Sequence, residues 1–314
     1  MTMVRFCALF VSVFWQVSPV SAQEMTHLFG PEDAPRRLVI RSTTDTDVFA
    51  GVVEAFLAER SGVSVLYEQW GSNDLYALTL QDCRSGQVGA DAVISSGVHQ
   101  MVKLVNDACA AKYESTLTRA LPQALRWRDE VWGITREPAV IVYNRASVPP
   151  TDVPRTRFDL LDLLRPADTP YAGKVATYDI EASGLGFLFA FMDSQEASTF
   201  GALLESLGRT GADATCCSAE IIEGVATGKY LLAYNVLGSY AEGFAREDDF
   251  FVIKINTFTI IRAVNHFLYF FVRAFKFGFF LALHHAHHSI DHASFSLGHR
   301  LAFTFWLLIR LFGV

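Results

Sequence analysis

Serine, threonine, glycine and one aspartate recur where apolar runs of this chain end. They form four polar loops: Ser42-Thr43-Thr44-Asp45, Ser95-Ser96-Gly97, Ser183-Gly184 and residues 235–240. Backbone N–H groups at a helix start carry partial positive charge, and serine hydroxyls add donors, so such loops can hold a carboxylate, a phosphate or a polyol. Serine is also a common helix N-cap, which is the structural alternative for each residue taken singly. Because four polar loops occur in one chain, we expect a binding site.

Two charged residues and two tyrosines extend this site. Arg136 could grip an anion and Glu137 an ammonium group, or the two could pair on the surface. Tyr234 and Tyr240 could form aromatic walls of the site. Alternatively, Tyr234 is a core residue of a strand and Tyr240 is a packing residue of the next helix. The predicted ligand-binding residues are therefore Ser42, Thr43, Thr44, Asp45, Ser95, Ser96, Arg136, Glu137, Ser183, Gly184, Tyr234 and Tyr240.

The motifs of common enzyme classes do not occur in the sequence. It holds no GxSxG elbow, no P-loop, no HExxH and no cysteine and histidine spacing for zinc. We therefore expect a non-enzymatic protein with no cofactor, no catalytic residue and no metal.

Four histidines near the C-terminus offer an alternative. On a helix, His284, His287, His288 and His292 would share a face and could bind metal. This segment is similar to the HxxHH box of membrane di-iron hydroxylases and desaturases. The upstream box of that family is represented only by residues 272–276, which hold no histidine. The alternative function is a membrane-attached di-iron hydroxylase-like fragment.

Composition changes near residue 250. Residues 251–314 contain thirteen of the 26 phenylalanines and seven of the nine histidines, with six basic residues and one acidic residue. Residues 267–283 could enter or contact a membrane, but Arg273 and Lys276 interrupt them at a cost of roughly 2.5–3.5 kcal/mol each at the bilayer centre. We favour a frameshifted or fused remnant over the membrane segment and the histidine site.

The polar loops need a scaffold of alternating strands and helices. Period-2 and period-3.6 patterns predict strands at 38–41, 63–67, 91–94, 132–135, 140–143, 173–177 and 231–235, and helices at 48–58, 74–79, 100–106, 185–192 and 220–227. This order predicts an α/β fold with right-handed crossovers between parallel strands. Ligands in such folds lie beyond the carboxyl ends of the strands, where the polar loops fall.

The N-terminus predicts export. Arg5, an apolar run at 6–17 and the small residues Val20-Ser21-Ala22 form a signal peptide that is cleaved after Ala22, which places the protein in the periplasm. The run is shorter than the roughly 20 residues of a spanning helix. Residues 1–250 hold 32 acidic and 20 basic residues, a net charge of −12 that argues against nucleic-acid binding.

Four cysteines remain after cleavage, and an oxidising compartment favours disulfides. Cys83 and Cys109 are the preferred pair, since they flank a predicted strand and the first turn of the next helix. For Cys216 and Cys217 we favour two small apolar residues, because a bridge between neighbours is strained and uncommon.

Five segments resemble a known family: LVIRSTTDTDVFAGVVEAF, YEQWGSNDLYALTL, ADAVISSGVHQMVKLVNDA, YAGKVATYDIEASGLGF and GKYLLAYNVLGSYAEG. They look like a periplasmic solute-binding protein of an ABC importer, in the branch of ferric-iron and sugar-phosphate binders, from residue 37 to about 250. The resemblance implies the type 2 periplasmic-binding fold, whose two lobes close on a solute, and an ABC permease as partner. The expected division is a signal peptide at 1–22, a first lobe at 23–135, a second lobe at 136–236, and a return segment with the aromatic tail at 237–314.

The ferric ligands of that branch are absent from the matching positions. A histidine, a glutamate and two adjacent tyrosines of the family fall at Asp45, Ser96, Leu237 and Gly238. Three of these four residues are unsuited to bind Fe(III), which needs several anionic oxygens. We therefore expect a small polar or anionic organic solute.

Overall fold

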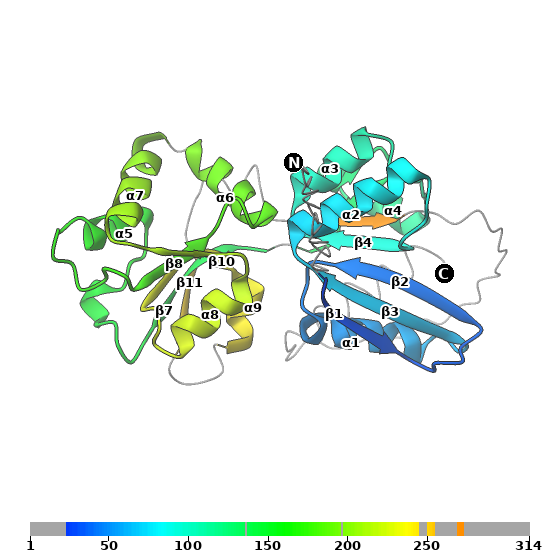
Figure 1. Ribbon diagram of the computed structural model, residues 1–314, viewed down its shortest axis with the longest axis horizontal. Coiled ribbons are helices and arrows are strands. Elements are labelled where there is room, and N and C mark those ends of the chain that lie inside the picture. The colour runs from blue at the N-terminus through cyan, green and yellow to red at the C-terminus, as the bar shows by residue number, and fades with distance from the viewer. Residues whose placement is uncertain (1–22, 136, 196, 245–249, 255–268, 273–314) are drawn as a thin grey trace, which may run out of the picture.

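The computed structural model describes residues 23–135, 137–195, 197–244, 250–254 and 269–272. The predictions for the signal peptide and for the four tail histidines lie outside these residues. The described chain forms two α/β lobes that lie side by side (Figure 1). Each lobe is built on one mixed sheet, with strand orders β1-β3-β2-β4-β12-β6-β5 and β11-β7-β10-β8-β9. The predicted two-lobed α/β fold is confirmed.

The first lobe follows the predicted strand and helix order. Its strands are β1 (Gln23–Phe29), β2 (Arg36–Ser42), β3 (Val63–Trp70), β4 (Ala92–Ser95), β5 (Arg126–Trp127), β6 (Val131–Gly133) and β12 (Tyr269–Val272). Its helices are α1 (Thr46–Ala58), α2 (Ser72–Ser85), α3 (Val98–Asn106), α4 (Thr116–Ala120) and a 3-10 turn (Gln123–Leu125). As the crossovers predict, β2 pairs in parallel with both β3 and β4. The strand β1 pairs antiparallel with β3.

The second lobe repeats this architecture. Its strands are β7 (Ala139–Asn144), β8 (Val175–Tyr178), β9 (Asp213–Thr215), β10 (Leu232–Leu237) and β11 (Phe250–Lys254). Its helices are α5 (Arg157–Leu164), α6 (Gly184–Ser194), α7 (Ala197–Arg209), α8 (Ser218–Ala226), α9 (Gly238–Phe244) and a 3-10 turn (Pro150–Asp152). Both α5 and α7 lack a counterpart among the predicted elements, although α5 begins with a capping box formed by Thr156 and Asp159.

The chain passes between the lobes more than once. It leaves the first sheet after β6 and enters the second at β7. The late strand β11 pairs with β7 in the second sheet, and β12 lies between β4 and β6 in the first. Two short strands of the region after residue 250 therefore belong to different sheets.

Helices cover both faces of the first sheet, which explains the short apolar runs within its central strands. Phe49 and Phe56 of α1 pack on Val65 of β3. On the opposite face, Leu75 of α2 and Leu104 of α3 pack in a second cluster with Val93 of β4. In Figure 1, α1 lies below the sheet and α2 and α3 lie above it. Parallel strands that are covered on both faces read as continuous apolar runs.

Of the two cysteine predictions, one is confirmed and the other is wrong. Cys83 at the end of α2 and Cys109 just after α3 form the predicted bridge, with Cα atoms 5.3 Å apart. The preference for unbridged cysteines at 216 and 217 is wrong, since these neighbours also form a disulfide. They occupy the turn between β9 and α8, and Cys217 is the N-cap of α8 with an extended backbone, so the turn brings the two sulfur atoms together.

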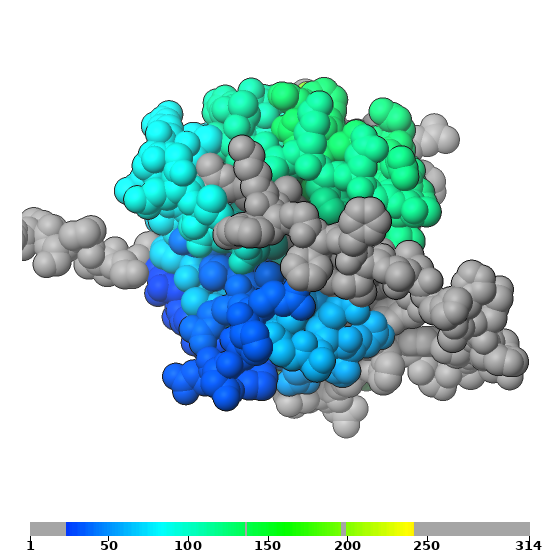
Figure 2. Space-filling model, turned by 90° about the vertical axis from the view of Figure 1, so that its right-hand side faces the viewer, coloured from blue at the N-terminus to red at the C-terminus, as the bar shows by residue number. Residues whose placement is uncertain are grey.

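Figure 2 shows the face of the first lobe that points away from the second lobe, with the N-terminal elements in blue and α2 in cyan. Among the residues that the structure describes, no helix is both long enough and apolar enough to cross a membrane.

Candidate functional site

Two of the predicted polar loops lie at the carboxyl ends of neighbouring parallel strands. Residues 42–45 follow β2 and residues 95–97 follow β4, and both strand ends reach the side of the first lobe that faces the second. The backbone N–H of Ser96 donates to Thr43 Oγ1 at 3.0 Å, and the Thr43 N–H donates to the Ile94 carbonyl at 3.1 Å. These bonds hold the two loops against each other.

The serines of these loops shape the backbone. Ser42 Oγ accepts the Thr44 N–H, and Ser95 Oγ accepts the Gly97 N–H, each at 3.0 Å. Both serines are fully buried. Ser183 is the N-cap of α6, and its Oγ accepts the Gly186 N–H at 3.1 Å. Ser183 therefore acts as a helix N-cap, which is the structural alternative for this residue. Ser42 and Ser95 instead stabilise turns.

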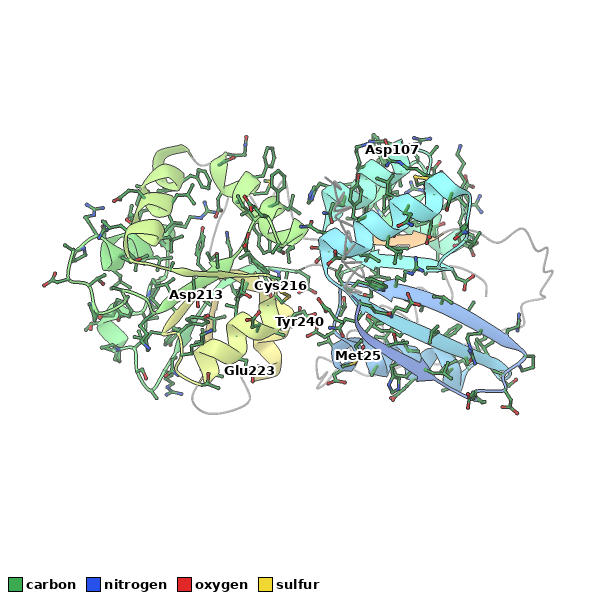
Figure 3. All side chains as sticks on the ribbon, in the orientation of Figure 1. Met25, Asp107, Asp213, Cys216, Glu223 and Tyr240 are labelled. Atoms are coloured by element: carbon green, nitrogen blue, oxygen red, sulfur yellow. A yellow bond between two sulfur atoms is a disulfide. The ribbon has the colours of Figure 1, made fainter. Side chains whose placement is uncertain are left out.

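Polar groups from the two lobes meet directly. The Asp45 N–H donates to the hydroxyl of Tyr240 at 3.0 Å, and the Gly184 N–H donates to Ser72 Oγ at 2.8 Å. Asn73 Nδ2 donates to the Glu181 carbonyl at 2.7 Å. Figure 3 shows Tyr240 on the side of the second lobe that faces the first. The lobe contact thus brings together Asp45, Gly184 and Tyr240, three of the residues that the sequence selects.

Asp45 lies in a cluster of oxygen-rich side chains. Gln69 Nε2 donates to Asp45 Oδ1 at 3.2 Å and to Glu24 Oε2 at 2.9 Å, while Gln69 Oε1 accepts the Thr46 N–H at 2.9 Å. Burial raises the pKa of the Asp45 carboxyl above its ordinary value of 3.8. The hydrogen bond with Tyr240 lowers that pKa, whereas the negative charges of Glu24 and Asp47 raise it further.

The contact between α3 and α6 depends on a glycine. Gln100 of α3 is only 9% exposed, and its Nε2 donates to Asn73 Oδ1 at 2.8 Å. A Cβ atom at Gly184 would lie 2.5 Å from Gln100 Nε2 and 2.6 Å from its Oε1. A side chain at this position would therefore require the Gln100 amide to move. Sequence reasoning missed Gln69, Ser72, Asn73 and Gln100, although Ser72 and Asn73 begin a helix that directly follows a strand.

Tyr234 lies apart from the other predicted residues. It is 3% exposed in the core of the second lobe, where its hydroxyl donates to Asp193 Oδ2 at 2.8 Å and accepts a bond from Arg157 Nε at 2.8 Å. Burial raises its pKa well above the ordinary value. The same residue lines a small, mostly apolar pocket between α6, α7 and the sheet. Its position matches the alternative of a strand core residue. Glu137 is half-buried between the lobes' sheets, and Arg136 lies outside the described residues.

A buried serine joins two strand ends of the second lobe at their carboxyl side. The Ser218 hydroxyl is hydrogen-bonded to the hydroxyl of Tyr178, and it accepts the Leu237 N–H at 3.0 Å. Tyr178 ends β8 and Leu237 ends β10. Ser218 therefore fixes the ends of two neighbouring strands.

The Ser218→Ala variant is expected to lose about 1–2 kcal/mol of unfolding free energy, because it leaves a buried hydroxyl and a buried N–H without their partner. Urea denaturation of the variant and the wild type measures this loss. Ser85→Ala is the control, because the Ser85 hydroxyl is exposed and bonds only to the Asp82 carbonyl. Equal stability of the two variants would contradict the assigned role of Ser218.

The positions that correspond to ferric ligands are not gathered as a metal site. Leu237 is a buried core residue, and the Gly238 N–H donates to the Pro138 carbonyl at 2.9 Å. Within the described residues, no three histidine, cysteine, aspartate or glutamate side chains group together in a way that could hold a metal ion.

Solved structures share this arrangement. The chain is similar to a substrate-binding protein of an ABC transporter from Agrobacterium tumefaciens, with a TM-score of 0.72 and 28% identity over 79% of this chain and 73% of that chain. It is also similar to iron-bound HitA from Pseudomonas aeruginosa, with a TM-score of 0.60 and 16% identity over 76% and 75% of the two chains. A ferric binding protein from Campylobacter jejuni gives a TM-score of 0.57 and 16% identity over 75% of each chain.

Neither a protein-family model nor a curated protein matches the sequence. The structural matches confirm the predicted resemblance to the substrate-binding proteins of ABC transporters. The matched structures named here are binding proteins.

Proposed function

We propose that this chain, which has the fold of ABC transporter substrate-binding proteins, is the extracytoplasmic receptor of an importer and captures a small polar organic solute between its lobes. The observation that carries this proposal is the direct contact of polar groups from both lobes beyond the carboxyl ends of their strands. Asp45 meets Tyr240 there, and Ser72 meets Gly184. Such strand ends are where α/β folds bind ligands.

Capture then follows from a shift in population. A solute that touches both lobes binds more tightly when the lobes are together than when they are apart, so it stabilises the closed arrangement. Delivery requires an ABC permease, which recognises the loaded receptor. The proposal also includes export to the periplasm through the signal peptide at 1–22.

Ferric iron is not the solute that we propose. Of the residues at the ferric-ligand positions, only Asp45 offers an anionic oxygen, and hard Fe(III) needs several such oxygens at once. The solute of a relative with 16% identity describes that relative alone.

Calorimetric titration of the purified chain tests the proposal. The panel contains sugar phosphates, phosphonates, carboxylates and polyamines, and a folded sample is verified by thermal unfolding. We expect one class to bind with one solute per chain. If every class fails to bind a folded sample, the proposed function is wrong.

A further inference from the structure

The side of the first lobe that meets the second lobe is rich in carboxylates. We call Glu24, Asp45 and Asp74 the acidic rim. Glu24 and Asp45 share the amide of Gln69. A Cβ atom at Gly71 would lie 3.3 Å from Asp74 Oδ2 and 3.6 Å from Glu24 Oε1. The three carboxylates therefore form one group next to the contacts with the second lobe, with Asp45 at the start of α1, Asp74 in the first turn of α2 and Glu24 on β1.

No cation of the described chain neutralises the acidic rim. The ion pairs among the described residues involve other carboxylates, including Glu68, Asp82 and Asp193. The pKa of Asp45 is raised by burial, and the charges that act on it, those of Glu24 and Asp47, raise it as well. Within the described residues, the acidic rim therefore holds negative charge without an ion-pair partner.

The backbone donors that would hold an anion already have partners within the protein. In the first lobe, the N–H groups of residues 43–46 and 96–98 donate to Ile94 O, Ser42 Oγ, Tyr240 Oη, Gln69 Oε1, Thr43 Oγ1, Ser95 Oγ and Ser96 O. In the second lobe, the N–H groups of Gly184 and Gly186 donate to Ser72 Oγ and Ser183 Oγ. These loops therefore present few free donors to a carboxylate or a phosphate.

A buried acceptor at the lobe contact is independent of the carboxylates. Gln100 is 91% buried, and its Oε1 has no hydrogen-bond partner among the described residues. This oxygen lies at the start of α6, close to where a Cβ on Gly184 would stand. The same amide is linked to α2 through Asn73. A buried carbonyl oxygen needs a donor, so the position of Gln100 favours a solute with N–H or O–H groups.

We propose that the solute is a small organic amine, whose ammonium group binds at Asp45 in the acidic rim and whose second donor group reaches Gln100 Oε1. This inference rests on the proposed function. An amine is a narrower class than the small polar or anionic solute expected from the sequence. The N–H groups of the polar loops donate to partners within the protein, so the loops present oxygen atoms to the lobe contact. Charge-assisted hydrogen bonds between ammonium and carboxylate supply the attraction.

Matched pairs of solutes test the sign of the charge. The chain is titrated by calorimetry at pH 7 with 1,4-diaminobutane, ethanolamine and spermidine, and with the anions succinate and ethyl phosphate. We expect at least one amine to bind and the anions not to bind. Binding of succinate or ethyl phosphate, without binding of any amine, overturns the amine proposal and leaves the receptor function intact. If none of these solutes binds, the amine proposal is wrong; if every class of the first panel also fails to bind a folded sample, the receptor function is wrong as well.

A substitution at Asp45 tests the position. The Asp45→Asn variant keeps the shape of the side chain, which makes no capping bond to α1, so the fold is expected to survive. We expect its affinity for the bound amine to fall at least about tenfold. Glu54→Gln on the same helix is the control and should stay within about twofold, because Glu54 is exposed and distant from the acidic rim. Equal affinities of the two variants would overturn the assignment.

The pH dependence gives a separate readout. The charged or titratable groups that interact with Asp45 are Glu24 on β1, Asp47 on α1, Tyr67 on β3, Tyr178 on β8 and Tyr240 on α9, with the neutral Gln69 on β3. The pKa of Asp45 is raised, so the carboxylate protonates above 3.8 as the pH falls. Amine affinity should therefore be constant near neutrality and decrease as the pH falls through that raised pKa. The Asp45→Asn variant should lack this decrease, and a decrease of the same size in it would contradict the assignment.

Discussion

Replacement of Asp193 by alanine is expected to lower the free energy of unfolding by about 3–5 kcal/mol. Asp193 is 5% exposed on α6 and forms an ion pair with Arg157 of α5. Tyr234 and Asn235 of β10 donate to its Oδ2 at 2.8 and 2.7 Å. Without the carboxylate, the Arg157 guanidinium, whose side chain is 10% exposed, would remain buried without its counter-charge.

Urea denaturation measures this effect, with an exposed ion pair as the control. Asp162 and Arg165 pair at 2.9 Å on the surface, with both side chains 68% exposed. The Asp162→Ala variant should therefore change stability by less than about 1 kcal/mol. Asp193→Asn should fall between the two, because an amide can still form hydrogen bonds. Losses of equal size for Asp193→Ala and Asp162→Ala would show that the buried network contributes little.

The Gly184→Ala variant is expected to bind the solute about fivefold more weakly, while each lobe stays folded. The added methyl group would overlap the Gln100 amide, which comes from the other lobe. Because the overlapping atoms are the end of a long side chain, we expect a cost at the lower end of overpacking, about 1 kcal/mol, and it falls only on the arrangement in which the lobes are together. An energy that disfavours the binding-competent state reduces the apparent affinity by the same amount.

The control for this variant is Gly201→Ala on α7. A Cβ atom at Gly201 has no neighbour within 4 Å, so neither affinity nor lobe contact should change. Small-angle scattering in the presence of solute should show a more extended particle for Gly184→Ala than for Gly201→Ala. Addition of Gln100→Ala to Gly184→Ala should restore the compact particle at saturating solute, because it removes the overlapping atoms, although it also removes the proposed contact of Gln100 with the solute. A compact Gly184→Ala particle with unchanged affinity would contradict this role of the glycine.

Much of the framework could be predicted because apolar periodicity reports burial. The strands β2, β3, β4 and β10 appear in the sequence as short apolar runs, since helices or the other elements of each lobe cover their faces. The pairing of Cys83 with Cys109 could also be predicted, because the two residues fall at the ends of neighbouring helices.

Other elements gave weak local signals. The strand β1 is mostly exposed and alternates poorly, because it lies at the edge of the first sheet. The strand β12 belongs to a region whose composition departs from the rest of the chain, and its place between β4 and β6 depends on pairing with residues far away in sequence. Such long-range pairing leaves no trace in a local pattern.

Only part of the candidate site could be predicted from the sequence. Asp45, Gly184 and Tyr240 follow strand ends, and a position after a strand is visible in the sequence. Gln69 contributes through side-chain contacts within the first lobe, and Gln100 through a contact across the lobe interface; only the folded chain defines both. The inward direction of the loop N–H groups is also a property of the fold, and it is the reason we propose an amine within the wider class of small polar or anionic solutes expected from the sequence.

Calorimetric titration of three forms of the chain, wild type, Asp45→Asn and Gly184→Ala, with the same solute panel tests the central claim most directly. We expect one solute class to bind the wild type with one solute per chain. We also expect a substitution in either lobe to weaken this binding. A solute that binds all three forms with equal affinity, or a folded wild type that binds none of the panel, would contradict a solute site between the two lobes.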